Sequence, residues 1–260
     1  MAVTVSGLAK RYAKDVLKDV SFELEAGALT VLMGPSGCGK TTLACMLAGY
    51  LAPDAGTLAI EGRPITEAGP DRIMVFQETA LWHWMTVLDN VMFGPRASGA
   101  MGGAQARSKA LELLEKFGLR DFKDRYPGQL SGGMRRRVEL AQAMINNPKL
   151  MILDEPFRGL DVMTRGLMQE YYLKIFGDNR MTESRMTTLF ITSELEEALV
   201  VGERVLIMDG TPARIAHSIQ IDLPYPRTPA VLASERALEI KKQLMAALYL
   251  PEHHTGAQQS

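Results

Sequence analysis

The sequence predicts an α/β fold with a parallel core sheet, an antiparallel edge sheet and a helical insert. Three short, almost continuously apolar runs, at 28–33, 150–153 and 188–192, have the pattern of strands buried on both faces. Between about Thr86 and Asn147 the strand pattern gives way to helical spacing, most clearly over 110–117. The 260 residues suffice for one well-buried domain with an inserted subdomain and a tail.

The remaining segments follow in chain order. Residues 3–8 and 17–24 alternate apolar and polar positions, which predicts an antiparallel edge sheet with one exposed face. After Gly210 the chain becomes proline-rich and ends in a predicted helix from Ser234 to Leu250, beyond which we expect disorder over 251–260. The expected organisation is a discontinuous core over 1–85 and 150–215, a helical subdomain over 86–149 and a C-terminal extension over 216–260.

Charge and cysteine content exclude several classes of protein. Lys and Arg total 29 against 30 Asp and Glu, so a net charge of −1 offers no general attraction for nucleic acid or anionic lipid. The two cysteines, Cys38 and Cys45, suit neither a disulfide framework nor a zinc site and are typical of a reducing cytosol. No stretch approaches the roughly 18 apolar residues of a membrane span. We therefore expect a soluble chain that reaches membranes only through a partner.

A phosphate-binding loop follows the first buried strand. Residues 34–41 read Gly-Pro-Ser-Gly-Cys-Gly-Lys-Thr and fit G-x-x-x-x-G-K-[ST] in full, directly before a predicted helix over 42–48. Backbone N–H groups and the helix N-terminus form an anion site, Lys40 adds a cation for the β- and γ-phosphates, and Thr41 is expected to hold Mg²⁺. The predicted cofactors are ATP and Mg²⁺. The residues expected to contact the nucleotide are Gly34, Pro35, Ser36, Gly37, Cys38, Gly39, Lys40, Thr41 and Thr42.

Two adjacent carboxylates, Asp154 and Glu155, close the second buried strand. In a parallel sheet they are expected beside the phosphate-binding loop, where Asp154 binds the metal and Glu155 polarises the attacking water. Such a pair taken alone is as often a solvated turn. The complete loop upstream favours the catalytic interpretation.

A second anion-binding motif lies in the helical region. Leu130-Ser-Gly-Gly-Met134 precedes a predicted helix, so Ser131, Gly132 and Gly133 can present a hydroxyl and N–H groups to a phosphate. The basic run from Arg135 to Arg137 is either a nucleic-acid patch or a solvated, partly interfacial helix face, and the neutral chain favours the helix face.

With this motif the chain resembles the ATP-binding cassette (ABC) ATPases, whose signature is L-S-G-G-x, from Val3 to about Leu250. The resemblance implies a P-loop NTPase with a RecA-like core and an inserted helical signature subdomain. In that family the signature loop closes over the ATP of the opposite subunit, so a second nucleotide-binding subunit, expected as a homodimer, is implied.

Further positions match the family one at a time. Tyr12 resembles the aromatic residue that stacks on adenine, although a plain strand-edge tyrosine is the alternative. Gln77 resembles the glutamine that completes the Mg²⁺ shell, and Asp161 lies in a segment similar to the loop that links the two composite sites. Ser193 departs from the pattern, because the family has histidine after the third buried strand. A serine carries no charge, so slow turnover is expected if Ser193 takes that histidine's catalytic place beside Lys40, Gln77 and Glu155.

Residues 81–91 resemble the segment where importers of this family form a groove for a coupling helix, and the two tryptophans, Trp82 and Trp84, line either that groove or the core. Gly69 to Arg72 and Asp222 to Arg227 resemble the nitrate, sulfonate, taurine and bicarbonate importer branch. Asn146 to Lys149 and Glu155 to Thr164 further resemble members of that branch that are associated with uptake of urea, guanidine or related amidines. The resemblance implies an ATP-hydrolysing subunit at the cytoplasmic face of the inner membrane, bound to integral-membrane permease subunits, indirectly served by a solute-binding protein, and without nucleic acid. The alternatives are a regulator with impaired hydrolysis and a soluble, non-transport ABC ATPase.

Overall fold

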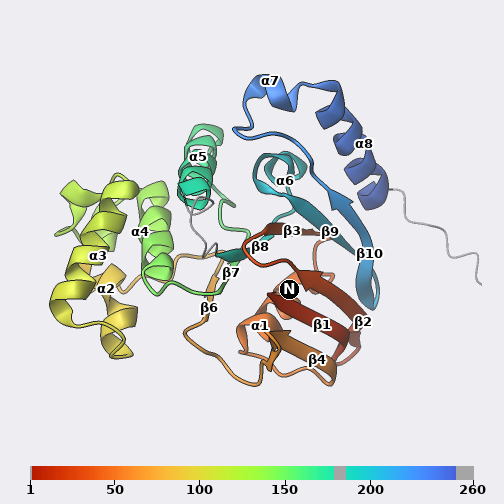
Figure 1. The fold of residues 1–260 in the computed structure, drawn as a ribbon, viewed down its shortest axis with the longest axis horizontal. Helices are drawn as coiled ribbons and strands as arrows, with labels where there is room; N and C mark the ends of the chain where they lie inside the picture. The colour runs from red at the N-terminus through yellow and green to blue at the C-terminus, as the bar shows by residue number, and fades with distance from the viewer. Residues whose placement is uncertain (1, 179–185, 250–260) are drawn as a thin grey trace, which may run out of the picture.

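The computed structural model describes residues 2–178 and 186–249, and the strands of this part form one strongly curled mixed sheet (Figure 1). The strands, in chain order, are β1 (Val3–Arg11), β2 (Asp15–Leu24), β3 (Leu29–Met33), β4 (Ala55–Ile60), β5 (Arg63–Pro64), β6 (Arg72–Val75), β7 (Leu150–Asp154), β8 (Thr187–Ile191), β9 (Arg204–Gly210) and β10 (Ala213–Gln220). Their order across the sheet is β5-β4-β1-β2-β10-β9-β3-β8-β7-β6.

The helices complete the set of elements. They are α1 (Lys40–Ala48), α2 (Val87–Ala97), α3 (Gly103–Lys116), α4 (Gly132–Met144), α5 (Val162–Asp178), α6 (Leu195–Val201), α7 (Pro229–Leu232) and α8 (Glu235–Tyr249), with short 3₁₀ turns at Arg120–Phe122 and Pro127–Gln129. None of the helices in the described part is long and apolar enough to cross a membrane.

The predicted parallel core is confirmed. The three apolar runs are β3, β8 and β7, which lie side by side and pair in parallel. Every residue of these strands is buried, as their continuous apolar pattern predicts. Two flanking parallel strands, β6 and β9, have no counterpart among the predictions. In β6 the first two of four residues are only half-buried, so the strand leaves a weak pattern.

The predicted antiparallel edge is also confirmed, since β1 pairs antiparallel with both β2 and β4. The sheet curls so that these strands face the parallel strands across α1. Side chains alternate along β3, and Leu32 therefore packs in the α1 core while Val31 and Met33 pack in a second core on the opposite face. The strand β3, which leads into residues 34–39, is therefore held between two apolar cores.

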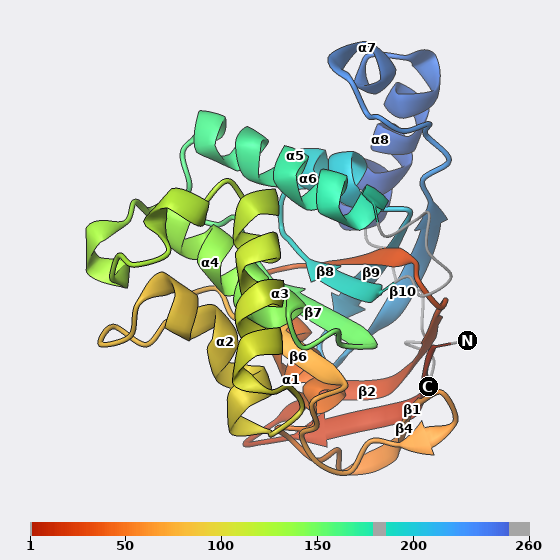
Figure 2. The ribbon, with the colours of Figure 1, turned by 60° about the vertical axis from the view of Figure 1, so that its left-hand side comes forward.

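Figure 1 shows α2, α3 and α4 together at one side of the sheet, within the stretch whose spacing predicts helices. Thr86 caps α2, because its hydroxyl accepts a hydrogen bond from the Asp89 N–H, and Ser131 caps α4 in the same way. Figure 2 shows α5, α6 and α8 above the sheet. Residues 155–161 join β7 to α5 and residues 192–194 join β8 to α6, so both connections lie where these helices meet the strand ends.

The C-terminal extension is attached through Arg227. This buried guanidinium donates to the carbonyl oxygens of Leu199 (2.6 Å) and Gly202 at the end of α6, and it stacks on Tyr225. The predicted final helix is confirmed as α8, whose Ile240 and Leu244 enter the core. The expectation for residues 251–260 lies outside the described part of the chain.

Candidate active site

The phosphate-binding loop joins the end of β3 to the first turn of α1. Lys40 is only 8% exposed, and its Nζ donates to the carbonyl oxygens of Gly34 and Pro35, both at 2.9 Å. Gly39 has a φ of 106°, and a Cβ there would lie 2.8 Å from Cδ2 of Leu17 on β2. Only glycine fits this position, and the loop can therefore curl around a buried ammonium group at a helix N-terminus.

The Thr41 hydroxyl and the Asp154 carboxylate meet between the loop and the end of β7. Thr41 Oγ1 donates to Asp154 Oδ2 at 2.8 Å. Burial raises the pKa of Asp154, and the hydrogen bond from Thr41 acts against that shift. Hydroxyl and carboxylate oxygens suit Mg²⁺, which takes few protein ligands and completes its shell with water and nucleotide phosphate. In the described residues no group of three or more His, Cys, Asp or Glu could hold a metal.

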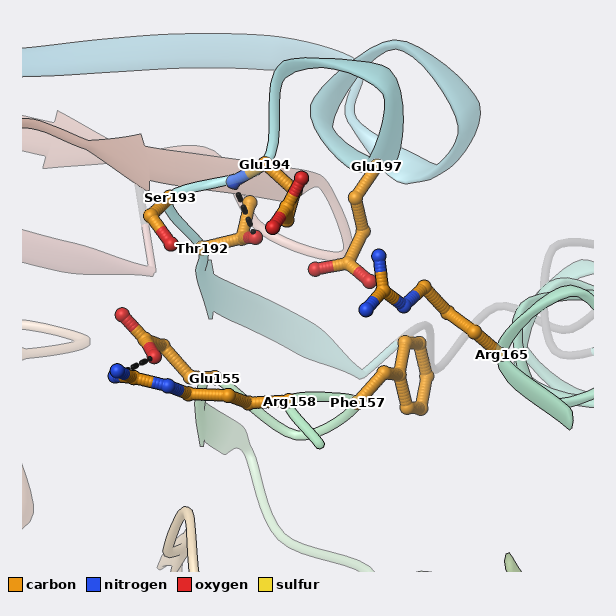
Figure 3. Close-up of a pocket in the computed structure, with 8 residues that line it drawn as sticks. All are labelled: Glu155, Phe157, Arg158, Arg165, Thr192, Ser193, Glu194 and Glu197. Carbon is orange, nitrogen blue, oxygen red and sulfur yellow. Dashed lines mark hydrogen bonds and ion pairs between the residues drawn. The ribbon is translucent and has the colours of Figure 1, made fainter. Parts of the chain in front are cut away.

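Glu155 and Ser193 line one small pocket of about 160 Å³, between the ends of β7 and β8 (Figure 3). Glu155 adopts a φ of 46° and its N–H donates to the Ile191 carbonyl at 2.9 Å, which fixes its backbone to β8. Its carboxylate lies on the same side of the pocket as the Ser193 hydroxyl. The structure therefore brings together a strained carboxylate residue and the serine that follows the third buried strand.

Arg158 is a pocket residue that the sequence reasoning missed. Its Nη1 contacts Glu155 Oε2 at 2.6 Å, which leaves the second carboxylate oxygen free of this ion pair. The other arginine of the pocket, Arg165, points toward Glu197 instead (Figure 3). The sequence signal for this ion pair was the spacing of three residues between Glu155 and Arg158. Two side chains at that spacing in a tight turn are near enough to contact each other.

Ser193→His should raise the ATPase rate several-fold. A histidine can donate a hydrogen bond to the terminal phosphate and carry charge, whereas the serine hydroxyl is shorter and neutral. Steady-state ATPase assays at saturating Mg-ATP check this, with Ser193→Asn as a neutral control of similar length to the histidine. An unchanged or lower rate in Ser193→His, at equal ATP affinity, would show that the serine does not limit turnover.

The signature loop is built around the N-terminus of α4. Ser131 Oγ accepts from the Met134 N–H at 3.3 Å, and a Cβ at Gly133 would lie 2.6 Å from Cγ2 of Thr164. Thr164 in turn donates to both carboxylate oxygens of Asp161, at 3.0 and 2.6 Å, and these bonds lower the pKa of Asp161. The first turns of α4 and α5, which directly follow Ser131 and Asp161, therefore lie in close contact within one subunit.

These two loops are separate from the phosphate-binding loop. Among residues 2–178 and 186–249, no hydrogen bond or ion pair joins 131–133 to 34–41. Tyr12 is exposed in the turn between β1 and β2, and Val16, near the start of β2, approaches Gly39. The roles expected for Tyr12, Gln77 and Asp161 toward the nucleotide remain predictions.

Two interpretations of side-chain environment are corrected. Arg136 is buried and paired with Glu139, so the run Arg135 to Arg137 is not simply a solvated face. The periodicity could not reveal this, because a segment from an earlier part of the chain covers that side of the helix. Trp84 is 69% exposed and Trp82 is partly exposed, so the core interpretation of the tryptophans is wrong. Trp82 packs its ring 5.2 Å from both Trp84 and Phe93, which forms an aromatic surface patch.

Comparisons with known proteins identify the family of the chain. The family model described as ABC transporter matches residues 17–158, which contain the phosphate-binding loop, the signature and the Asp154–Glu155 pair. A Ruegeria pomeroyi protein, named a taurine import ATP-binding protein, is 45% identical over 209 residues, covering 80% of this chain and 75% of its own. A Brucella abortus protein named for ATP binding is 35% identical over 259 residues, 99% of this chain and 97% of its own.

A solved structure shows the same fold with products bound. It is a dimeric ATP-binding cassette in a post-hydrolysis state with ADP and Pi, which superposes with a TM-score of 0.72 at 27% identity. The match covers 84% of this chain and 98% of that one. Since the family model spans more than half of the chain and the relatives align over most of it, the chain belongs to the ABC transporter family and is an ATPase of the nitrate, sulfonate and taurine branch.

Proposed function

We propose that this chain is the ATP-hydrolysing subunit of an importer, which couples ATP-driven closure of a homodimer to uptake of a small polar solute. The observation that carries the proposal is the contact between Thr41 and Asp154, which places the phosphate-binding loop beside the strand end that bears Glu155. Relatives over 76–85% of the chain are named taurine import ATP-binding proteins, which supports a sulfonate or similar cargo. A urea-type or guanidine-type solute is the alternative cargo.

The residues of the candidate active site divide the work of hydrolysis. Lys40 and the N–H groups of the loop bind the β- and γ-phosphates, and Thr41, Gln77 and Asp154 would hold the metal. Mg²⁺, when bound, offsets the negative charge of the transferred phosphoryl group. The free oxygen of Glu155 orients water and accepts its proton as the new O–P bond forms and the bond to the β–γ bridging oxygen breaks. The products are ADP and phosphate.

Dimerisation is supported by the incomplete site of a single subunit. Ser131 to Gly133 form an anion site at a helix N-terminus, and among the described residues that site makes no hydrogen bond to the phosphate-binding loop of its own chain. The large apolar side chains of Val162 and Met163, directly after Asp161, are strongly exposed. A second copy would bury them and bring its own signature loop over the nucleotide. The similar cassette with ADP and Pi is dimeric.

The patch of Trp82, Trp84 and Phe93 supports a permease partner. Its rings pack on one another while remaining partly exposed, which is expected of a surface that receives an apolar helix. The proposal places the chain at the cytoplasmic face of the inner membrane through that permease. A solute-binding protein would act only indirectly, from the other side.

Trp84→Ala should weaken binding to the permease partner at least about tenfold, as expected for loss of an exposed aromatic anchor. Co-purification from detergent-solubilised membranes measures this loss. Tyr249→Ala removes an equally exposed aromatic side chain from α8 and should leave binding unchanged. If the wild type itself captures no permease while hydrolysing ATP, the importer function is wrong and the soluble ATPase is favoured.

A further inference from the structure

A buried ion pair on the signature helix does not belong to the nucleotide-binding residues. Arg136 and Glu139 lie three residues apart on α4, and their side chains are only 5% and 6% exposed. Burial raises the pKa of Glu139, and the charge of Arg136 acts against that shift. A charged pair so far from water is retained only where additional hydrogen bonds satisfy it. The partners of those bonds therefore indicate what the pair holds.

The partners all lie in the segment that carries Gln77. The guanidinium of Arg136 donates to the carbonyl oxygens of Phe76 (2.7 Å) and Gln77, and Glu139 Oε1 accepts from the Ala80 N–H at 3.0 Å. This segment follows β6 and has no helix or strand of its own. Its backbone groups on either side of Gln77 are consequently fixed to α4, while the Gln77 side chain stays exposed.

The same helix begins at the signature loop. Ser131 caps α4, and Arg136 lies five residues further along, little more than one turn. An α-helix transmits a displacement over one turn as a rigid rod, so a movement of the Gln77 backbone must move Ser131 to Gly133, and the reverse. The ion pair is the polar link between the two, because Arg136 and Glu139 both bond the loop from the helix.

We propose that Arg136 and Glu139 are positioning residues that hold Gln77 in register with the Ser131–Gly133 loop and thereby couple the two nucleotide sites of the dimer. The inference rests on the proposed function, in which Gln77 serves the metal of its own subunit and Ser131 caps the nucleotide of the partner. Nucleotide bound at one phosphate-binding loop then sets the signature loop that meets the other nucleotide. ATP-driven dimerisation is the step that depends on this coupling.

The test replaces the pair as a unit in a chain that cannot hydrolyse ATP. A substitution of Arg136 or Glu139 alone would leave the other charge buried without a partner. Replacing both residues by apolar residues of similar size leaves no buried charge. The R136M/E139L double variant is therefore made in the Glu155→Gln background, and sedimentation velocity measures the ATP concentration that gives half-maximal dimer. We expect this concentration to rise at least about tenfold, while ATP affinity at low protein concentration stays within about twofold.

Arg137→Met in the same background is the matched control. Arg137 lies on the same helix and also donates to a backbone carbonyl, that of Phe117 at 2.8 Å, a residue outside the Gln77 segment. This control should dimerise like its parent. Arg136→Lys keeps the charge and one donor, and it should give an intermediate shift even if the double variant fails to fold, which circular dichroism reports.

Two outcomes separate this inference from the function on which it rests. If the Glu155→Gln parent dimerises with ATP but the folded double variant does so at the same ATP concentration, the pair is only a structural brace and the inference is overturned. If the double variant does not fold, and the folded Arg136→Lys variant reaches half-maximal dimer at the same ATP concentration as its parent, the inference is also overturned. If the parent does not dimerise with ATP at all, the proposed dimer mechanism fails, and coupling between two sites fails with it.

Discussion

The Glu155→Gln variant should bind ATP with unchanged affinity and hydrolyse it at least about 100-fold more slowly, which corresponds to about 2.7 kcal/mol of transition-state stabilisation. Glutamine keeps the shape of the side chain and can still accept a hydrogen bond from Arg158, but it cannot take a proton from water. Single-turnover ATPase assays measure the rate, and calorimetric titration measures the affinity. Because the nucleotide persists, ATP should also shift this variant toward the dimer on gel filtration.

Glu194→Gln provides the matched control for that experiment. Glu194 lines the same pocket, but its N–H donates to Thr192 Oγ1, and the ion pair of Arg158 is with Glu155 instead. We expect a rate within about threefold of the wild type, as for a carboxylate that is not the general base. A Glu155→Gln chain that still hydrolyses ATP at more than about one tenth of the wild-type rate would exclude Glu155 from this role.

The Lys40→Met variant should lose at least about 100-fold in ATP affinity, or about 2.7 kcal/mol. The ammonium of Lys40 lies inside the phosphate-binding loop and is held by two carbonyl oxygens at 2.9 Å, so it is already placed for an incoming phosphate. Methionine fills similar space without charge. The loss removes charge-assisted hydrogen bonds that contribute about 1.5–3 kcal/mol each. Titration calorimetry with ATP checks the result.

Thermal unfolding must accompany the Lys40 measurement, because the substitution also leaves the Gly34 and Pro35 carbonyl oxygens without their donor. Lys116→Met is a suitable control, since Lys116 is a second lysine with a defined partner, Glu112 Oε1 at 3.1 Å, and no predicted nucleotide contact lies on its helix α3. It should bind ATP normally. Retained tight ATP binding in a folded Lys40→Met chain would contradict the assigned phosphate site.

Much of the fold could be predicted because its signals are local. The runs at β3, β7 and β8 are buried at every position, and only a strand covered on both faces is so uniform over five residues. The loop at 34–41 is similarly local, since its glycines, Lys40 and the following helix are contiguous in the chain. The strand β6 escaped prediction because half of its four residues remain partly exposed.

The environment of individual charges could not be predicted in this way. Arg136 belongs to a run of three arginines on a helix, and its sequence neighbours do not distinguish it from Arg135 and Arg137, which are only half-buried. Its burial comes from the segment between Phe76 and Ala80, which lies far earlier in the chain and folds across that face of α4. Arg158 likewise reaches Glu155 only because the backbone after β7 turns back at a positive φ.

Residue types at short spacing are enough to predict the chemical groups of this site, namely a phosphate-binding loop, a metal carboxylate, a base and a second anion site. Which of these groups meet depends on how the whole chain folds. Folding joins Thr41 to Asp154 across 113 positions, places Glu155 beside Ser193, and leaves Ser131 without a bond to its own phosphate-binding loop in the described residues. The residue types within one short segment determine what that segment can bind. The order of the strands and the packing of the helices determine which segments become neighbours.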